Sequence, residues 1–197
     1  MKRSILLPLL TILLAAAVLL GASAALQGVA AANAQKEHLQ IMQTLLPGST
    51  EFTVEPYSGQ DATIRSVHKG QNGFVIETVT AGYAGQITML IGVSNEGTVT
   101  GLVVREMSET LGLGWGALSD HRFLSQFLNT SGDVAVGQPG ADAFSGATGS
   151  DTSDASTYVD AISGATVTSK AIARCVNAAV AYVTGADIDS GATSWGG

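Results

Sequence analysis

The sequence is poor in the residues that build disulfides and metal sites. It contains one cysteine, Cys175, which excludes an intramolecular disulfide and a multi-cysteine metal site. Cys175 lies in an apolar helical pattern, and this favours a buried, unreactive thiol over a nucleophile. The three histidines, His38, His68 and His121, are scattered without ligand spacing, so we expect them at the surface and predict no metal site.

Positive charge is also scarce. Lys2 and Arg3 account for two of the nine basic residues, so the rest of the chain carries seven basic residues against 16 acidic ones. A protein that binds nucleic acid needs a basic stripe to displace counterions from the phosphates. The sequence has no such stripe, and we do not expect nucleic acid as a partner.

The N-terminal segment is long, apolar and uncharged. No charged residue occurs between Arg3 and Lys36, and Ile5–Leu26 is almost entirely Leu, Ile, Val and Ala. A helix of about 20 apolar residues spans a bilayer, and the positive residues before it favour a cytoplasmic N-terminus. A cleaved signal peptide is the alternative, although the apolar stretch of a signal peptide is typically about 7–15 residues long. We predict an uncleaved anchor over residues 1–35, single-pass in the cell membrane, with the rest of the chain on the extracytoplasmic side.

After the anchor, the pattern indicates one α+β domain over residues 36–185. Lys36–Leu46 has apolar residues at helical spacing and is followed by a Pro-Gly break. Alternating and β-branched residues predict strands in FVIETVT, QITMLIGV and TVTGLVVRE, and the last two form an antiparallel hairpin that we place at the centre of a sheet. We therefore expect a mainly antiparallel sheet flanked by helices.

The second half of the chain contains two predicted helices and a polar interruption. His121–Leu128 is a short apolar-faced segment, and Ser169–Thr184 is amphipathic with Gly185 as its stop. Residues 140–157 are rich in Asp, Ser, Thr and Gly, so we predict a polar loop or insertion there. Residues 186–197 are predicted to form a flexible tail.

The tetrapeptide SGAT occurs three times, each time with an aspartate three residues before the serine. The copies are Ser145–Thr148, Ser163–Thr166 and Ser190–Thr193. Because the chain is rich in Gly, Ala, Ser and Thr, the repeat alone is weak evidence. Only the second copy is followed by an amphipathic helical pattern, so this copy is the candidate site.

The start of a helix suits a phosphate, because it carries unpaired backbone N–H groups and the positive end of the helix dipole. Gly164 and Ala165 leave room for a phosphate to approach, while Ser163, Thr168 and Ser169 add hydroxyl donors. The alternative is that Ser163 or Thr168 merely caps the helix, which is worth about 1 kcal/mol. From local chemistry alone, capping is favoured over anion binding.

The segment DAISGATVTSKAI, Asp160–Ile172, resembles the flavinylation motif of the FMN-binding domain family. This family includes the G subunit of the Rnf complex and the C subunit of the sodium-pumping NADH:quinone reductase. The resemblance implies that Thr166 carries FMN through a phosphoester bond and that a flavin transferase attaches it from FAD. The same match assigns Asp160, Ser163, Gly164, Ala165, Thr168 and Ser169 to the cofactor site.

A second resemblance covers Gly82–Gly114, which is similar to the glycine-rich strand, hairpin and loop of the family. The loop residues assigned to the flavin ring are Glu109, Thr110, Gly112, Leu113 and Gly114. Leu111 stands where the family usually has proline, and this predicts a less rigid loop. FLSQF also resembles the segment that follows the loop, whereas the region with the extra SGAT does not match the family and is an insertion or an alternative acceptor site.

The resemblance implies an electron-transfer flavoprotein subunit of an Rnf-type ion-translocating oxidoreductase complex. Its partners would be the other subunits of that complex, the flavin transferase and the membrane. No residue of the chain is then required as a general acid or base. Two alternatives remain open: a free-standing extracytoplasmic FMN carrier that serves another reductase, and an anchored binding module without flavin.

Overall fold

The computed structural model describes residues 3–59, 61–108, 116, 119–137 and 157–186. The chain divides into two units, Met1–Ile41 and Met42–Gly197. The predicted domain boundary between residues 35 and 36 lies shortly before this division. Almost all of the predicted polar loop at 140–157 and of the tail at 186–197 lies outside the described residues.

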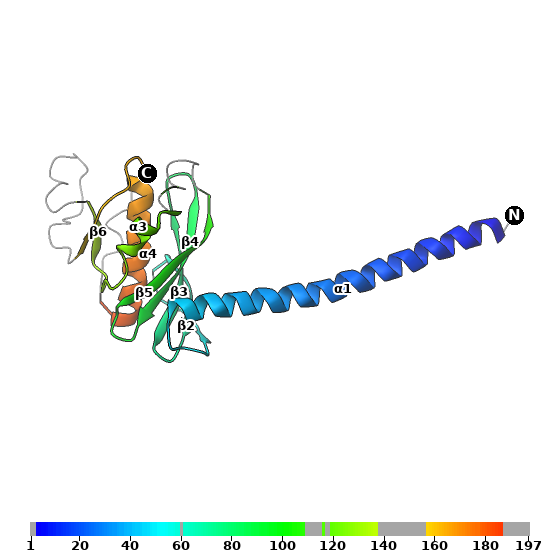
Figure 1. Ribbon diagram of the computed structural model, residues 1–197, viewed down its shortest axis with the longest axis horizontal. Coiled ribbons are helices and arrows are strands. Elements are labelled where there is room, and N and C mark those ends of the chain that lie inside the picture. The colour runs from blue at the N-terminus through cyan, green and yellow to red at the C-terminus, as the bar shows by residue number, and fades with distance from the viewer. Residues whose placement is uncertain (1–2, 60, 109–115, 117–118, 138–156, 187–197) are drawn as a thin grey trace. The chain divides into compact units, whose positions relative to one another are not determined.

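The first unit is part of one long helix, α1 (Arg3–Leu45), drawn in blue in Figure 1. The sequence predicted an anchor and then a separate helix from Lys36, whereas the structure joins the two into a single element. Several apolar side chains of α1 are exposed, namely Leu13, Leu14, Val18, Leu19, Leu20 and Val29. A search of the described residues identifies no helix long and apolar enough to cross a membrane.

The second unit is built on a five-stranded antiparallel sheet in which every strand pairs with its neighbour in sequence. The strands are β1 (Thr53–Glu55), β2 (Ile64–Lys69), β3 (Gly73–Ala81), β4 (Gln86–Ser94) and β5 (Val99–Met107). The three strands expected from the sequence are confirmed as β3, β4 and β5. Their predicted place was partly wrong, because β3 is central and the β4–β5 hairpin lies at one end of the strand order.

One face of the sheet is covered by helix α4 (Thr166–Thr184), whose apolar side packs on β3 and β4 (Figure 1). Ile76 and Met89 from the sheet meet Ile172 and Val176 from the helix, and all four side chains are fully buried. Burial of this layer stabilises the unit by about 25 cal/mol for each Å² of apolar surface removed from water. The helix ends at Gly185, whose φ of 67° gives the predicted left-handed stop.

The other face of the sheet receives the last turn of α1, from Met42 to Leu46, whose apolar side chains are buried. This close approach depends on Gly92 and Gly101, which pair across β4 and β5. A Cβ atom on Gly92 would collide with the backbone of Leu45. The hydroxyl of Thr100 donates a hydrogen bond to the Leu45 carbonyl oxygen, so the end of the helix is tied to the sheet.

A small second sheet connects the first sheet to α4. Helix α3 (His121–Ser125) is capped by Asp120, whose carboxylate accepts a hydrogen bond from the Arg122 N–H at 2.8 Å. After α3 come the short strands β6 (Val134–Val136) and β7 (Thr157–Val159), which pair in parallel. The side-chain amide of Asn177 on α4 binds both the N–H and the carbonyl of Val134, at 2.9 and 3.0 Å, and so holds β6 against the helix.

The direction of α4 along the sheet decides where its two ends lie. Thr184, at the end of α4, lies against Gly97 in the β4–β5 turn. The 19 residues of α4 span about 28 Å, and the nine residues of β4 span about 30 Å. The N-terminus of α4 therefore lies near the opposite end of the strands, where β3 turns into β4 and where β5 ends.

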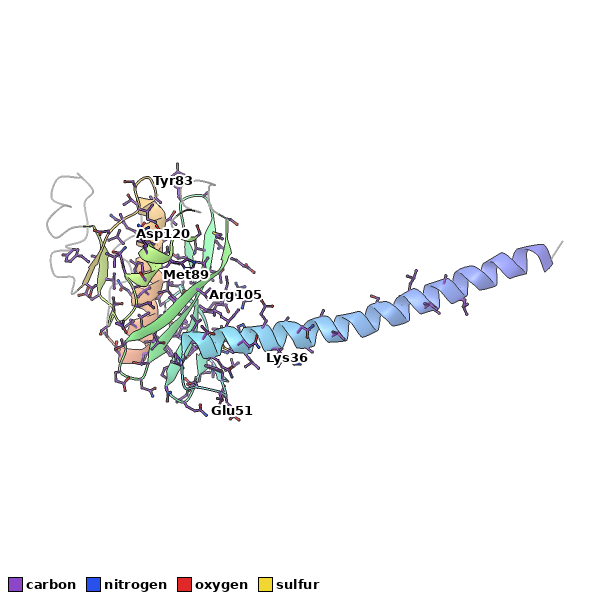
Figure 2. All side chains as sticks on the ribbon, in the orientation of Figure 1. Lys36, Glu51, Tyr83, Met89, Arg105 and Asp120 are labelled. Carbon is purple, nitrogen blue, oxygen red and sulfur yellow. The ribbon has the colours of Figure 1, made fainter. Side chains whose placement is uncertain are left out.

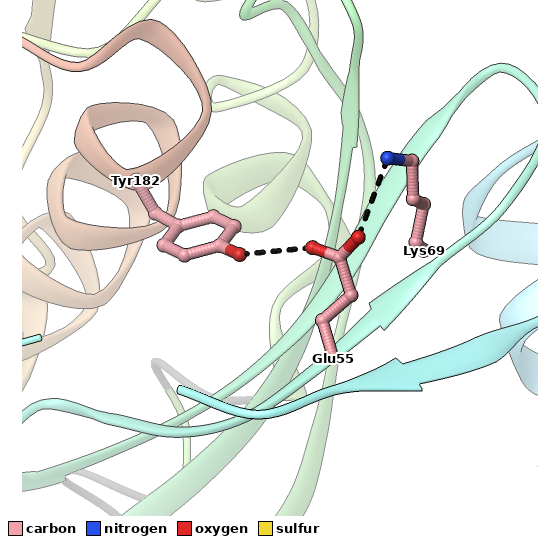
Figure 3. Close-up of polar contacts among 3 residues, drawn as sticks. All are labelled: Glu55, Lys69 and Tyr182. Carbon is pink, nitrogen blue, oxygen red and sulfur yellow. Dashed lines mark hydrogen bonds and ion pairs between the residues drawn. The ribbon is translucent and has the colours of Figure 1, made fainter. Parts of the chain in front are cut away.

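The far end of α4 is fixed by a polar and aromatic contact. The Tyr182 hydroxyl donates to Glu55 at 3.2 Å, and Glu55 also pairs with Lys69 at 3.3 Å (Figure 3). The rings of Tyr57 and Phe74 lie edge-on to Tyr182, at 5.8 and 5.7 Å between centroids. The pKa of Tyr182 is raised, mainly by burial and to a smaller extent by the hydrogen bond with Glu55.

Candidate functional site

The candidate site begins with a tight turn between β7 and α4. The backbone N–H of Ala165 donates to the carbonyl of Ile162 at 2.9 Å, and Gly164 has a φ of 79°. These features fit a type II turn, which needs a residue with positive φ at its third position, and glycine adopts that conformation without steric cost. The Ser-Gly-Ala-Thr sequence is therefore a turn that leads directly into a helix.

The helix begins at Thr166, three residues earlier than the sequence predicted. Its N-cap is Ala165, which makes no side-chain capping bond, so the expectation that Ser163 or Thr168 caps the helix is wrong. The backbone N–H groups of Thr166, Val167 and Thr168 belong to the first turn and have no intrahelical acceptor. The side chain of Thr166 is exposed beside these donors.

The hydroxyls of Thr168 and Ser169, both in the first turn of α4, differ in their partners. The Ser169 hydroxyl donates to the Ala165 carbonyl at 2.9 Å and accepts from the Ile162 N–H at 3.4 Å, so it braces the turn. The Thr168 hydroxyl is fully buried and has no hydrogen-bond partner among the described residues. A buried, unpaired hydroxyl is rare and costs about 1–3 kcal/mol. Thr168 therefore offers a spare donor beside the helix N-terminus.

Asp160 leads into the turn and is held through its backbone. Its N–H donates to the side-chain oxygen of Gln126 at 2.8 Å, while its own side chain is exposed. Gln126 follows α3 directly, and the buried pair Phe123 and Phe127 fixes this segment with a ring-centroid distance of 5.3 Å. The sequence analysis gave Gln126 no role, because the hydrogen bond joins residues 34 positions apart.

The glycine loop assigned to the flavin ring, Glu109–Gly114, lies outside the described residues. Its starting point is visible: the N–H of Ser108 donates to the Gln86 carbonyl at 3.2 Å. This contact fixes the start of the loop at the β3–β4 end of the sheet, where α4 also begins. In Figure 2, the exposed Tyr83 marks this end of the unit, and Glu51 lies at the opposite end.

The other two SGAT copies, Ser145–Thr148 and Ser190–Thr193, also lie outside the described residues. The structure therefore describes one copy, the one that ends in Thr166. Ser163, Gly164 and Thr166 are exposed, while Ala165, Thr168 and Ser169 are buried. The residues of this copy form one short turn with backbone donors on its outer side.

Cysteine and histidine contribute little to this site. Cys175 is fully buried on the inner face of α4, as predicted, and burial raises the pKa of its thiol to about 12. His121 is exposed, and His38 and His68 are half-buried. In the part of the chain that the structure describes, no group of three or more His, Cys, Asp or Glu side chains could hold a metal ion.

The turn and the helix start fit the phosphate end of a flavin nucleotide. Free N–H groups and the positive end of the α4 dipole favour an anion there, and the unpaired Thr168 hydroxyl adds one more donor. Thr166, which carries a hydroxyl group, is exposed at the same place. The arrangement can bind a phosphate.

Two proteins of related organisation are similar to the chain in sequence. The chain is 31% identical over 166 residues to the G subunit of the ion-translocating oxidoreductase complex of Methanosarcina acetivorans, covering 78% of this chain and 77% of that protein. It is 33% identical over 110 residues to the G subunit of the Na(+)-translocating ferredoxin:NAD(+) oxidoreductase complex of Acetobacterium woodii. That alignment covers 55% of this chain and 47% of the relative.

A solved structure and a family model complete the comparison. The chain is similar to the crystal structure of Shewanella oneidensis NqrC, with 20% identity, a TM-score of 0.43 and coverage of 74% and 73% of the two chains. The FMN-binding domain model matches residues 82–181, which run from the β3–β4 turn to within the last turn of α4 and include the whole turn from Ile162 to Ala165. Together with the relative that it matches over most of both lengths, this shows that the chain belongs to the FMN-binding domain family.

Proposed function

We propose that the chain is a membrane-anchored electron-transfer subunit with FMN bound covalently to Thr166 through a phosphoester. The observation that carries this proposal is the exposed Thr166 hydroxyl at the first residue of α4, beside free backbone donors. FMN accepts two electrons together and releases them singly, so it joins two-electron and one-electron carriers. A covalent bond keeps the cofactor on a protein that works outside the cytoplasm.

In this proposal each part of the turn has a separate task. The N–H groups of Val167 and Thr168 and the Thr168 hydroxyl bind the phosphate oxygens. Gly164 provides the positive φ that brings the turn into the helix, and Ser169 holds the turn closed through Ala165. Asp160 and Ser163 flank the phosphate from the β7 side. No side chain of the chain acts as a general acid or base.

The ring system of the flavin then extends toward the end of the sheet. Glu109, Thr110, Gly112, Leu113 and Gly114 pack against it in our proposal, because the loop that they form starts at Ser108 on this end. Glycines allow the backbone to approach a flat ring closely, since they carry no Cβ. The β3–β4 turn at Gly82–Gly85 borders the same region.

The long helix α1 serves as the membrane anchor in this proposal. Its exposed leucines and valines are suited to a lipid environment, and its uncharged stretch follows Lys2 and Arg3. The FMN-binding unit then faces the extracytoplasmic side of the cell membrane. Retention of the full-length chain in carbonate-washed membranes tests the anchor, and a soluble form that starts near residue 30 would contradict it.

The partners follow from the relatives. Two relatives are named as G subunits of ion-translocating oxidoreductase complexes, one of them acting between ferredoxin and NAD(+). We propose that this chain is likewise the G subunit of an Rnf-type complex and passes electrons between other subunits of that complex. A flavin transferase is the partner during maturation, with FAD as the donor.

The deciding experiment replaces the acceptor hydroxyl. We expect Thr166→Val, made in the full-length chain coexpressed with a flavin transferase, to abolish covalent FMN, because valine keeps the shape of threonine and removes the attacking oxygen. Thr148→Val and Thr193→Val are matched controls in the other two SGAT copies and should remain labelled. Intact mass and in-gel fluorescence measure the result, and FMN on the Thr148 peptide with Thr166 unmodified would contradict the assignment.

A further inference from the structure

One stripe of α4 runs from Thr166 away from the helix start and carries two cationic side chains. Thr166, Lys170, Arg174 and Asn177 are spaced by four, four and three residues, so they share one side of the helix. Asn177 holds β6, which places the small sheet over the far part of this stripe. Lys170 is half-buried, whereas Thr166 is exposed.

Lys170 is placed to reach the phosphate. Residues four apart on a helix have Cβ atoms about 5–6 Å from each other. Helical side chains also point back toward the N-terminus, so a lysine at position 170 extends toward the turn that contains residue 166. Its ammonium group can therefore lie next to any anion attached at Thr166.

No carboxylate in the described part of the chain forms an ion pair with Lys170, whereas Lys69 pairs with Glu55 at the other end of α4. A cation in the second turn of a helix faces the positive end of the helix dipole, which is unfavourable without an anion nearby. The fully buried Thr168 hydroxyl, which has no partner among the described residues, is a second polar group in the first two turns of α4 that an anion at the helix start would satisfy. Both observations are explained by one negatively charged group.

We propose that Lys170 is the counter-ion of the flavin phosphate at Thr166. The proposal rests on the covalent FMN proposed above. The ammonium group of Lys170 neutralises the single negative charge of the phosphodiester, while Thr168 and the first-turn N–H groups hold its oxygens. Lys170 is thus a positioning residue that fixes the phosphate end of the cofactor.

This role predicts that the effect of removing Lys170 changes sign when FMN is attached. The test uses the full-length chain in detergent, produced with and without the flavin transferase, so that the two forms have the same sequence. In the unlabelled form, Lys170→Met should leave the melting temperature unchanged or raise it, because the dipole repels the cation. In the labelled form, the same change should lower the melting temperature by about 0.4–2 °C.

Two further conditions make the expected result specific to charge. Lys170→Arg should restore the labelled behaviour, because arginine keeps the positive charge. In 1 M salt the Debye length is about 3 Å, so the difference between labelled and unlabelled forms should shrink. Lys69→Met is the matched control: its partner is Glu55 at the far end of α4, so it should affect both forms equally.

The outcomes separate this inference from the proposed function. If the wild-type chain takes up no FMN at Thr166, the proposed function fails and this inference fails with it. If the wild-type chain is labelled but Lys170→Met has the same effect in both forms, only the counter-ion role is overturned. If the transferase labels Lys170→Arg and not Lys170→Met, the requirement for charge beside the phosphate is supported. Loss of labelling in both variants would indicate a structural role and overturn the proposal.

Discussion

The unpaired hydroxyl of Thr168 provides the most direct test of the proposed phosphate site. The side chain is fully buried, and its oxygen has no hydrogen-bond partner among the described residues. An unsatisfied buried hydroxyl costs about 1–3 kcal/mol. Valine has nearly the same shape, and both residues are β-branched with similar helix propensity, so the change removes the hydroxyl and little else. Thr168→Val should therefore stabilise the chain that carries no FMN.

The expected gain is about 1 kcal/mol or more. For a domain of this size, that corresponds to a rise of about 2–4 °C in melting temperature for each kcal/mol. Thermal unfolding of the unlabelled chain, followed by circular dichroism, measures it. Ser169→Ala is the matched control, because the Ser169 hydroxyl is bonded to Ala165 and its loss should destabilise the chain by about 1 kcal/mol.

The same substitution should behave differently once FMN is attached. If the Thr168 hydroxyl donates to the phosphate, Thr168→Val loses a charge-assisted hydrogen bond, and the gain seen in the unlabelled chain should vanish or reverse. A protein that keeps a destabilising group at a binding site illustrates the usual conflict between stability and function. A lower melting temperature of unlabelled Thr168→Val would refute the reasoning, since it would show that the hydroxyl is satisfied without the cofactor.

The remaining predictions concern the turn and the buried thiol. Gly164 has a φ of 79°, a backbone conformation that costs other residues about 1–2 kcal/mol. We therefore expect Gly164→Ala to lower both the urea midpoint of unfolding and the yield of labelling, and Gly164→Asn to lower them less. Equal urea midpoints for the wild type and both variants would contradict a left-handed turn. Burial raises the pKa of the Cys175 thiol from 9.0 to about 12. The folded state therefore keeps the proton that the unfolded chain loses, so this contribution to stability is complete below pH 9 and is lost as the pH rises from 9 toward 12. Between pH 8 and 11, the free energy of unfolding should fall with pH less steeply in Cys175→Ala than in the wild type, by up to about 1.4 kcal/mol per pH unit. Rapid alkylation of the native thiol at pH 8 would argue against its burial.

Strands were predictable where the local pattern was strong and long. β3, β4 and β5 each have nine residues with dense β-branched and apolar content, and the sequence located all three. β1, β6 and β7 have three residues each, too few for a period to be recognised. The parallel pairing of β6 with β7 joins segments about 23 residues apart, and no local pattern reports such a contact. The missed strands β1 and β2 are also the reason why the β4–β5 hairpin is not central.

At the candidate site, too, the local sequence pattern predicted some features and missed others. The apolar helix pattern that follows Ser163–Thr166 favoured this SGAT copy over the other two, and the structure confirms that a helix follows it. The pattern could not show that the helix starts at Thr166 or that its N-cap is Ala165, because helix ends depend on which backbone and side-chain groups find partners. It suggested three equivalent hydroxyl donors at Ser163, Thr168 and Ser169, whereas the structure uses Ser169 to brace the turn and leaves Thr168 unpaired.

The sequence by itself determined the properties that depend on residues close together in the chain. These are the apolar N-terminal helix, the three long strands, and the amphipathic helix with its glycine stop. Only the tertiary structure decided which ends of these elements meet. The contact of Thr184 with Gly97 sets the direction of α4, and this direction brings Thr166 to the end of the sheet where the Glu109–Gly114 loop starts. Such an arrangement depends on packing between residues far apart in the chain, and local propensity does not encode it.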